Sequence, residues 1–399
     1  MTTYRGLISA FIVVVALAGC APTPAATGPT ASVAPSATSV ASIEPSATPV
    51  ASASSTGQAS AFPTEAFGDI SEEPVSEEKA AGFQAILDDL AGEAGLSATV
   101  MSVHGTWSGA TGKADGVRDV RVDDQFAIAS TTKALVAAQV MQMVEAGELR
   151  LEDLAADHLP PDLDFDTNGA TIRDLLGQRS GIPDYLPTVD PQLIAEPLRP
   201  WTPAELLAEV PANRTTAGEA FEYGNTNYVL LGLVIEEVRG RPIVKVLRQG
   251  VLGIDGVERL IYQPDEIPTE PMAMPNGEST DVLETGGGFL PSLALTSDGP
   301  AASMASDAPS LARWWRAFCA GEIVSQASLT EMTTMQDGYG LGLYKPDPPG
   351  TVGHGGEHIG YASLAGCLPA HGAVVVVLSN RLVDISAVAE PLVDAALSG

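Results

Sequence analysis

Two side chains spaced for nucleophilic catalysis stand at the start of a predicted helix. Ser130-Thr-Thr-Lys133 puts a hydroxyl and an amine at positions i and i+3, which share one face of an α-helix. A lysine kept uncharged by burial can accept the hydroxyl proton and so activate the serine. The apolar run Phe126-Ala-Ile-Ala precedes Ser130, and apolar residues follow Lys133, so a charge on the amine would be costly. Ser130 and Lys133 are therefore candidate catalytic residues.

The same spacing occurs a second time, where it predicts only local structure. Ser76-Glu-Glu-Lys79 also matches Ser-x-x-Lys, but Ser76 follows Pro74 and stands among four acids before an amphipathic stretch. Serine is a preferred helix N-cap, and Ser76 is interpreted as one. Because the pattern alone is weak, other motifs must decide about Ser130.

A second motif, Tyr223-Gly-Asn225, is the single Tyr-x-Asn of the chain. A phenol in this position could relay a proton between serine, lysine and leaving group. The amide could hold the lysine and a substrate carbonyl. Taken alone, Tyr223 and Asn225 fit better as a cap for the helix predicted to begin near residue 225.

A third motif is His354-Gly-Gly356, followed by Glu357 and His358. Glycines let a substrate backbone approach a strand edge closely. The same residues match His-x-x-Glu-His, a zinc-peptidase pattern that requires both histidines on one face of a helix. Two consecutive glycines argue against a helix here, so a zinc metallopeptidase is kept only as a remote alternative.

In their order and spacing, the three motifs resemble the serine β-lactamase and D-alanyl-D-alanine carboxypeptidase family, of the class C-like, penicillin-binding-protein type. The resemblance covers about residues 80–399. That family usually has His-Thr before a Ser-Gly pair, where this chain has Gln178-Arg179, a departure that is interpreted as structural. Of the two His-x-Gly matches, only His354 has the family's Gly and aromatic residue six and seven positions later.

The resemblance implies a role for each side chain. Ser130 would attack a carbonyl and become acylated, with Lys133 as the base. Tyr223 would pass the proton to the leaving group, and Asn225 would position Lys133 and the substrate. Water would then release the acyl group. Neither a metal nor an organic cofactor is implied.

The third motif would bind the substrate. By resemblance, His354, Gly355 and Gly356 line a strand beside the cleft, and the backbone N–H groups of Ser130 and Glu357 form the oxyanion hole.

The fold class expected is α/β (α+β). An antiparallel sheet flanked by helices is built from both chain ends, and a mainly helical domain is inserted between them. The expected strands are 97–104, 107–114, 339–345, 359–368 and 373–379. The expected helices are 131–147, 203–210, 225–239, 307–320 and 384–398. The predicted parts are a lipoprotein signal peptide (1–19), a disordered tether rich in Ala, Pro, Ser and Thr (20–70), an α/β domain (71–148 with 291–399) and a helical domain (149–290).

The N-terminus predicts export and lipidation. Arg5 precedes an uncharged, mostly apolar run from Leu7 to Ala18, shorter than the ~20 residues that a membrane-spanning helix needs. The run ends in Leu-Ala-Gly-Cys20, which looks like the lipobox of bacterial lipoproteins. The predicted location is therefore extracytoplasmic, lipid-anchored to the bacterial cell membrane. Cys319 and Cys367 would then form an even pair, for which a disulfide remains one of two possibilities.

Charge and composition limit the partners. The formal net charge of −30 argues against nucleic acid, because phosphate backbones repel such a surface. The hydrophobic content of 45% suits a large core, and three cysteines are too few for a disulfide scaffold. Apart from the lipid anchor, the expected partner is a small acyl substrate, and a monomer is expected.

The substrate class stays open among a peptidoglycan peptide, a β-lactam and an ester. The predicted activity is that of a lipid-anchored serine hydrolase of β-lactamase-related, D,D-carboxypeptidase or esterase type. An efficient β-lactamase is disfavoured, because the third motif offers His354 and the nearest cation in sequence is Lys345. The alternative is a non-hydrolytic β-lactam- or peptidoglycan-binding sensor domain on the same fold.

Overall fold

The structure, a computed structural model, describes residues 61–196, 199–268, 272–275, 299–358 and 360–398. The predicted signal peptide, Cys20 and most of the predicted tether lie outside these residues.

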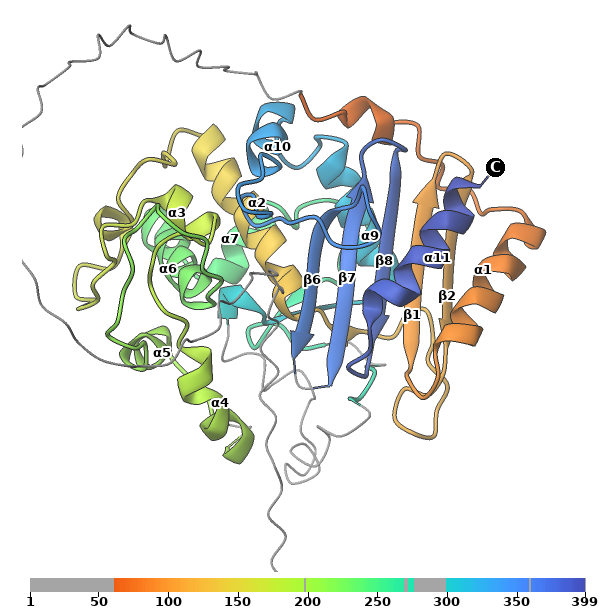
Figure 1. The fold of residues 1–399 in the computed structure, drawn as a ribbon, viewed down its shortest axis with the longest axis horizontal. Coiled ribbons are helices and arrows are strands. Elements are labelled where there is room, and N and C mark those ends of the chain that lie inside the picture. The colour runs from red at the N-terminus through yellow and green to blue at the C-terminus, as the bar shows by residue number, and fades with distance from the viewer. Residues whose placement is uncertain (1–60, 197–198, 269–271, 276–298, 359, 399) are drawn as a thin grey trace, which may run out of the picture. The chain divides into compact units, whose positions relative to one another are not determined.

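An antiparallel sheet of five strands is built from both ends of the described chain (Figure 1). Its order is β2-β1-β8-β7-β6, so the hairpin from the start of the body lies beside the last strand of the chain. The strand bounds are Leu96–Ser102 (β1), Gly105–Thr111 (β2), Val352–His358 (β6), Tyr361–Leu368 (β7) and Ala373–Ser379 (β8). The predicted fold class and the origin of the sheet are confirmed.

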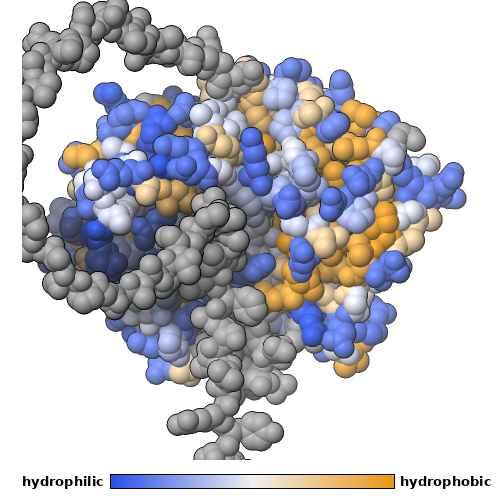
Figure 2. Space-filling model, viewed as in Figure 1, coloured by the Kyte–Doolittle hydropathy of each residue, from blue (hydrophilic) through white to orange (hydrophobic). Residues whose placement is uncertain are grey.

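Helices cover both faces of this sheet. On one face α1 (Glu77–Leu90) and α11 (Ile385–Leu397) pack against each other and against the strands, as Figure 1 shows. On the other face α9 (Ala308–Cys319) contacts β1, β7 and β8. On the side of the molecule seen in Figure 2, apolar residues gather over α11, while hydrophilic residues cover much of the helical half.

The central strand β8 explains why two layers of helices are needed. Val375 and Val377 belong to the apolar cluster formed with α1 and α11, and Val374 and Val376 belong to the cluster that contains α9. Successive side chains of a strand point to opposite faces, so a continuous run of valines must be buried on both sides.

The rest of the described chain is mainly helical. These helices are α2 (Thr132–Glu145), α3 (Ile172–Leu176), α4 (Leu186–Ala195), α5 (Pro203–Ala208), α6 (Thr226–Arg239), α7 (Ile243–Gln249) and α10 (Gln326–Met332), with 3-10 turns η1 (Thr64–Phe67), η2 (Ala129–Thr131) and η3 (Ala155–His158). Within α6, a Cβ on Gly232 would lie 2.2 Å from Pro300 Cγ, so only glycine lets the segment of Pro300 pack onto this helix. The helix ends at Gly240, whose left-handed conformation (φ 62°) closes it.

A second, small sheet was not predicted. Its order is β3-β5-β4, with bounds Phe126–Ala127, Met304–Ser306 and Ile261–Tyr262. Strands of two or three residues are too short to show a periodic pattern. This sheet ties the residues before η2 to the segment that follows Pro300.

One predicted boundary and one predicted strand are wrong. The body begins well before residue 70, because η1 is folded and Phe62 and Phe67 are buried in the core. Residues 339–345 form isolated bridges at Tyr339 and Tyr344 instead of a strand. Gly342, in a left-handed conformation (φ 73°), interrupts the extended backbone there.

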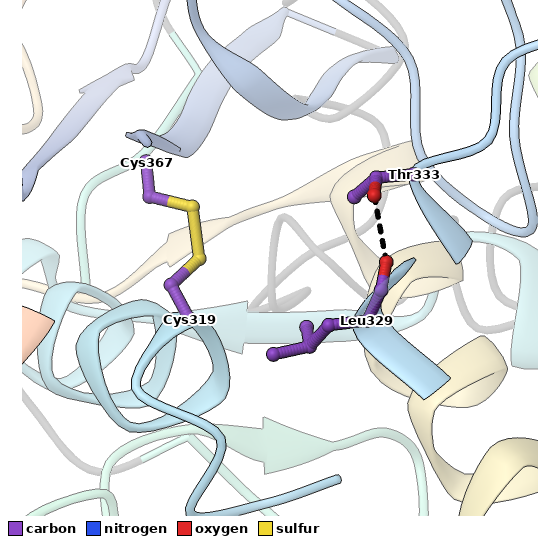
Figure 3. The surroundings of a disulfide bond; sticks show 4 residues. All are labelled: Cys319, Leu329, Thr333 and Cys367. Carbon is purple, nitrogen blue, oxygen red and sulfur yellow. Dashed lines mark hydrogen bonds between the residues drawn. A yellow bond between two sulfur atoms is a disulfide. The ribbon is translucent and has the colours of Figure 1, made fainter. Parts of the chain in front are cut away.

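A disulfide joins Cys319 of α9 to Cys367 of β7, and both residues are fully buried (Figure 3). Leu329 of α10 and Thr333 lie beside it, and the Thr333 hydroxyl donates a hydrogen bond to the Leu329 carbonyl at 2.7 Å. The disulfide therefore connects strand β7 of the five-stranded sheet to helix α9, which packs on one face of that sheet. Among the residues that the structure describes, no helix has both the length and the apolar character that crossing a bilayer requires.

Candidate active site

Ser130 lies in the tight turn η2, just before α2. Ala129 before it has φ 45°, a left-handed conformation that is uncommon for a residue with a side chain. Hydrogen bonds hold this turn in place: Ile128 N–H donates to the Met304 carbonyl at 3.0 Å, and Ser363 Oγ donates to the Ile128 carbonyl at 2.7 Å. The surrounding strands therefore maintain a strained backbone that presents Ser130 at the start of the helix.

Lys133, one turn later, is fully buried among polar groups. Its Nζ lies 3.0 Å from Ser130 Oγ, 2.7 Å from Asn225 Oδ1 and 2.9 Å from the carbonyl oxygen of Ala301. The ring of Tyr223 lies 5.0 Å from the same nitrogen. The amine predicted to be the base is thus within hydrogen-bonding reach of the predicted nucleophile.

Asn225 is the N-cap residue of α6 by position, but its side chain makes no cap hydrogen bond. Its Oδ1 accepts from Lys133, and its Nδ2 donates to Asp184 Oδ2 at 3.0 Å. The cap interpretation of this side chain is therefore wrong. Tyr223 is partly exposed (39%) and meets the ring of Tyr339 edge-on, with 6.2 Å between the centroids.

Asp184 is a residue of this site that the sequence analysis missed. Besides the bond to the Asn225 amide, its Oδ1 accepts from the Asn225 backbone N–H at 3.1 Å and from Leu186 N–H at 3.2 Å. The available signal was an acid directly after Ile182-Pro183, in the turn that follows the Ser-Gly pair.

Gln178 stands where the family usually has a histidine, and it forms hydrogen bonds with the segment that carries Tyr223 and Asn225. Its Oε1 accepts from Gly224 N–H at 3.0 Å and from Asn227 Nδ2 at 2.5 Å, and its backbone carbonyl accepts from Glu222 N–H at 2.8 Å. Gln178 is buried and has φ 59°, a conformation that these bonds stabilise. The turn that carries Tyr223 is therefore held by Gln178.

His354 lies on β6 and is buried. Its Nδ1 is 2.5 Å from the Gly355 carbonyl oxygen, which can only accept, so Nδ1 carries the proton of the neutral ring. Its Nε2, 3.1 Å from the Tyr339 hydroxyl, then accepts. Burial lowers the pKa of His354 from 6.5 to about 3. The ring is therefore neutral at physiological pH.

The strand β6 runs directly beside the turn of Ser130. Thr131 Oγ1 donates to the His354 carbonyl at 3.2 Å, which joins the two segments. A Cβ on Gly356 would lie 2.4 Å from the Ile128 carbonyl oxygen and 2.7 Å from the Ser130 nitrogen, so this approach requires glycine. Gly355 faces the Tyr344 hydroxyl, and Glu357 is exposed. The oxyanion hole assigned to the N–H groups of Ser130 and Glu357 stays a prediction.

The zinc alternative is wrong on geometry. His354 and His358 lie on a strand, four residues apart, which separates their Cα atoms by about 13 Å. A helix would bring such a pair to one ion, and a strand does not. In the described part of the chain, no group of three or more His, Cys, Asp or Glu side chains is arranged to hold a metal ion.

Known proteins with similar sequences were found over most of the chain. A sequence model described as Beta-lactamase matches residues 83–397. Penicillin-binding protein 4* of Bacillus subtilis (strain 168) is 26% identical over 297 residues, which are 67% of this chain and 63% of that protein. This chain therefore spans less than two thirds of the length of that relative.

Two solved structures are similar over almost their full length. A D-stereospecific amidohydrolase from Streptomyces sp. superposes with a TM-score of 0.66 at 25% identity, over 80% of this chain and 99% of that one. The D-amino acid amidase from Ochrobactrum anthropi SV3 gives a TM-score of 0.67 at 25% identity, over 80% and 98%.

Proposed function

The chain belongs to the beta-lactamase family, and from this premise we propose that it is a serine hydrolase that forms its acyl-enzyme on Ser130. The observation that carries the proposal is the 3.0 Å contact between Lys133 Nζ and Ser130 Oγ in a buried, polar-lined position. A base must lie within hydrogen-bonding distance of the proton that it takes, and this pair does.

The surroundings of Lys133 support its role as the base. The oxygens of Asn225 and Ala301 can only accept, so each takes one N–H of the amine. In the neutral amine, the remaining position is a lone pair directed at Ser130 Oγ. Lys133 can then remove the serine proton as Ser130 attacks the carbonyl. In our proposal that proton next passes from Lys133 through the Tyr223 hydroxyl to the leaving group.

For the substrate we favour the amide of a small acyl group, because the two similar structures are a D-stereospecific amidohydrolase and a D-amino acid amidase. The neutral His354 argues against a substrate held by its carboxylate, because such a group needs a cation or several donors. Lys345, the nearest cation to His354 in sequence, is exposed. Efficient β-lactam hydrolysis is therefore disfavoured, and amides of D-amino acids are the first substrates to assay.

The test uses the chain's own second Ser-x-x-Lys as a control. Ser130→Ala should abolish hydrolysis of an activated ester and labelling by a fluorophosphonate, and peptide mapping should place the label on Ser130. Ser76→Ala removes a hydroxyl that only accepts from Lys79 N–H at 3.3 Å, and it should leave both signals unchanged. Full activity in Ser130→Ala would refute the proposal. Acylation of Ser130 by the ester or by a β-lactam without turnover of either would instead favour the sensor alternative.

We also propose that the chain is exported and lipid-anchored through Cys20. A buried disulfide between Cys319 and Cys367 suits an oxidising compartment, and it leaves Cys20 as the third cysteine of the chain. Cys20→Ala should move the protein from the membrane fraction to the soluble fraction of cells that make it. A wild-type protein found in the soluble fraction would contradict the anchor.

A further inference from the structure

We propose that Asp184 is a positioning residue that sets the orientation of the Asn225 amide, and through it the direction in which Lys133 presents its lone pair. This inference rests on the proposed function. Asp184 would act through the Asn225 side chain and not by contact with the reacting atoms.

The geometry allows one arrangement of the amide. A carboxylate can only accept, so the Asn225 atom that faces Asp184 Oδ2 at 3.0 Å must be the NH₂ group. The carbonyl end of the same amide then faces Lys133 Nζ at 2.7 Å. Without the Asp184 carboxylate, the contact with a neutral Lys133 would accept either end of the Asn225 amide, because a neutral amine can both donate and accept.

The carboxylate is itself held by backbone. Asp184 Oδ1 accepts from the N–H groups of Asn225 and Leu186, at 3.1 and 3.2 Å. These two bonds fix Oδ1, and so leave Oδ2 for the side chain of Asn225. The turn before α4 and the start of α6 are thereby joined through one side chain.

The orientation matters because of the proton that must move. When Asn225 presents its oxygen, Lys133 can donate N–H groups to Asn225 and Ala301 and direct its lone pair at Ser130 Oγ, 3.0 Å away. If Asn225 presented its NH₂ group, the neutral amine would accept from it, and the lone pair would turn away from Ser130. The base would still be present, but misdirected.

The experiment compares three variants of the full chain. Asp184→Asn keeps an oxygen for the two backbone donors, so its NH₂ group faces the NH₂ of Asn225 and forces that amide to turn. We expect kcat for an activated ester to fall about 100-fold, the order of loss that follows from small misplacement of catalytic groups. Asn225→Asp places two carboxylates face to face and should be impaired as well.

The double variant Asp184→Asn/Asn225→Asp restores every donor–acceptor pair. The NH₂ of residue 184 donates to the new carboxylate, whose other oxygen accepts from Lys133. The added negative charge beside Lys133 favours the ammonium form. We therefore expect activity to return at least tenfold relative to Asp184→Asn above pH 9, with the acidic limb of the pH profile displaced to higher pH. If Asp184 had only a structural role, the double variant would not regain activity with a pH profile that is displaced to higher pH.

Asp164→Asn is the control, because Asp164 is exposed and the change removes the same charge from the helical half. It should leave kcat and the pH profile unchanged. Thermal unfolding of each variant identifies any that fail to fold.

Each outcome is decisive. Asp184→Asn with kcat within threefold of wild type overturns the inference, as does a folded double variant that recovers no activity at any pH. A wild-type chain that no fluorophosphonate labels at Ser130 overturns the proposed function and this inference together. A labelled wild type with an unaffected Asp184→Asn overturns the inference alone.

Discussion

Gly356 of β6 lies so close to the turn of Ser130 that a Cβ atom on it would come within 2.7 Å of the Ser130 amide nitrogen. The neighbouring Gly355 would direct its Cβ at the end of a side chain, the Tyr344 hydroxyl at 2.6 Å. The backbone at Ile128 and Ser130 is held by hydrogen bonds with strands β5 and β7, so it cannot move aside as the Tyr344 side chain can.

This difference predicts unequal effects of two alanines. Gly356→Ala should push β6 away from the turn and lower kcat/KM about 100-fold or more, the loss expected when an oxyanion donor is misplaced. Gly355→Ala should cost less than tenfold, because Tyr344 can shift. Steady-state kinetics on an activated ester measures both, and equal losses would contradict the close approach as the cause.

Lys133 is predicted to act as a base and not only as a charge. Lys133→Arg keeps a cation and its donors but cannot give up a proton at any usable pH, and Lys133→Met keeps apolar bulk alone. Both should lower kcat/KM by about 10³-fold, within the range of proton-transfer catalysis. More than a tenth of wild-type activity in a folded Lys133→Arg variant would show that the charge, and not the proton transfer, is what matters.

His354 should make the protein less stable in acid. Its pKa is about 3 in the folded chain and near 6.5 when unfolded, so only the unfolded chain gains a proton as pH falls below 6.5. Folding is therefore disfavoured progressively from pH 6.5 down to 3, by about 2 kcal/mol at pH 5.

The matched variant is His354→Gln, which removes this titration but keeps a polar side chain beside Tyr339. The free energy of unfolding, measured in urea at pH 7.5 and 5, should fall by about 2 kcal/mol more in wild type than in the variant. The same pH dependence in both would mean that His354 is accessible to protons in the folded chain.

The disulfide is expected to add substantial stability. Cys319 and Cys367 are 48 residues apart, and closing a loop of that size removes chain entropy worth about 4 kcal/mol from the unfolded state. The Cys319→Ala/Cys367→Ala variant should therefore unfold at clearly lower urea concentration. In the unfolded, unreduced wild type, these two cysteines should not react with a thiol reagent, and their reaction would disprove the bond.

The helix α2 and the five-stranded sheet could be predicted because their sequence signals are local. Ser130 and Lys133 are one helical turn apart, and the valine run of β8 favours a strand wherever it lies. The contact between Lys133 and Asn225 follows from the family resemblance and not from periodicity.

Other parts of the site leave no readable signal. The carbonyl of Ala301 belongs to the backbone, and every residue has one. Asp184 and Gln178 become meaningful only when the turn before α4 meets the start of α6. Residues 339–345 alternate in a way that suggests a strand, but the left-handed Gly342 prevents it.

The strand order of the five-stranded sheet determines when the sheet can form during synthesis of the chain. β1 pairs with β8 along its length, and most of the described chain lies between these two strands in sequence. Ser363 of β7, which holds the turn of Ser130, also comes late. A chain synthesised from its N-terminus therefore cannot complete this sheet or form the turn of Ser130 until β7 and β8 have been made. If the chain is exported across a membrane during its synthesis, the site around Ser130 therefore cannot form in the cytoplasm.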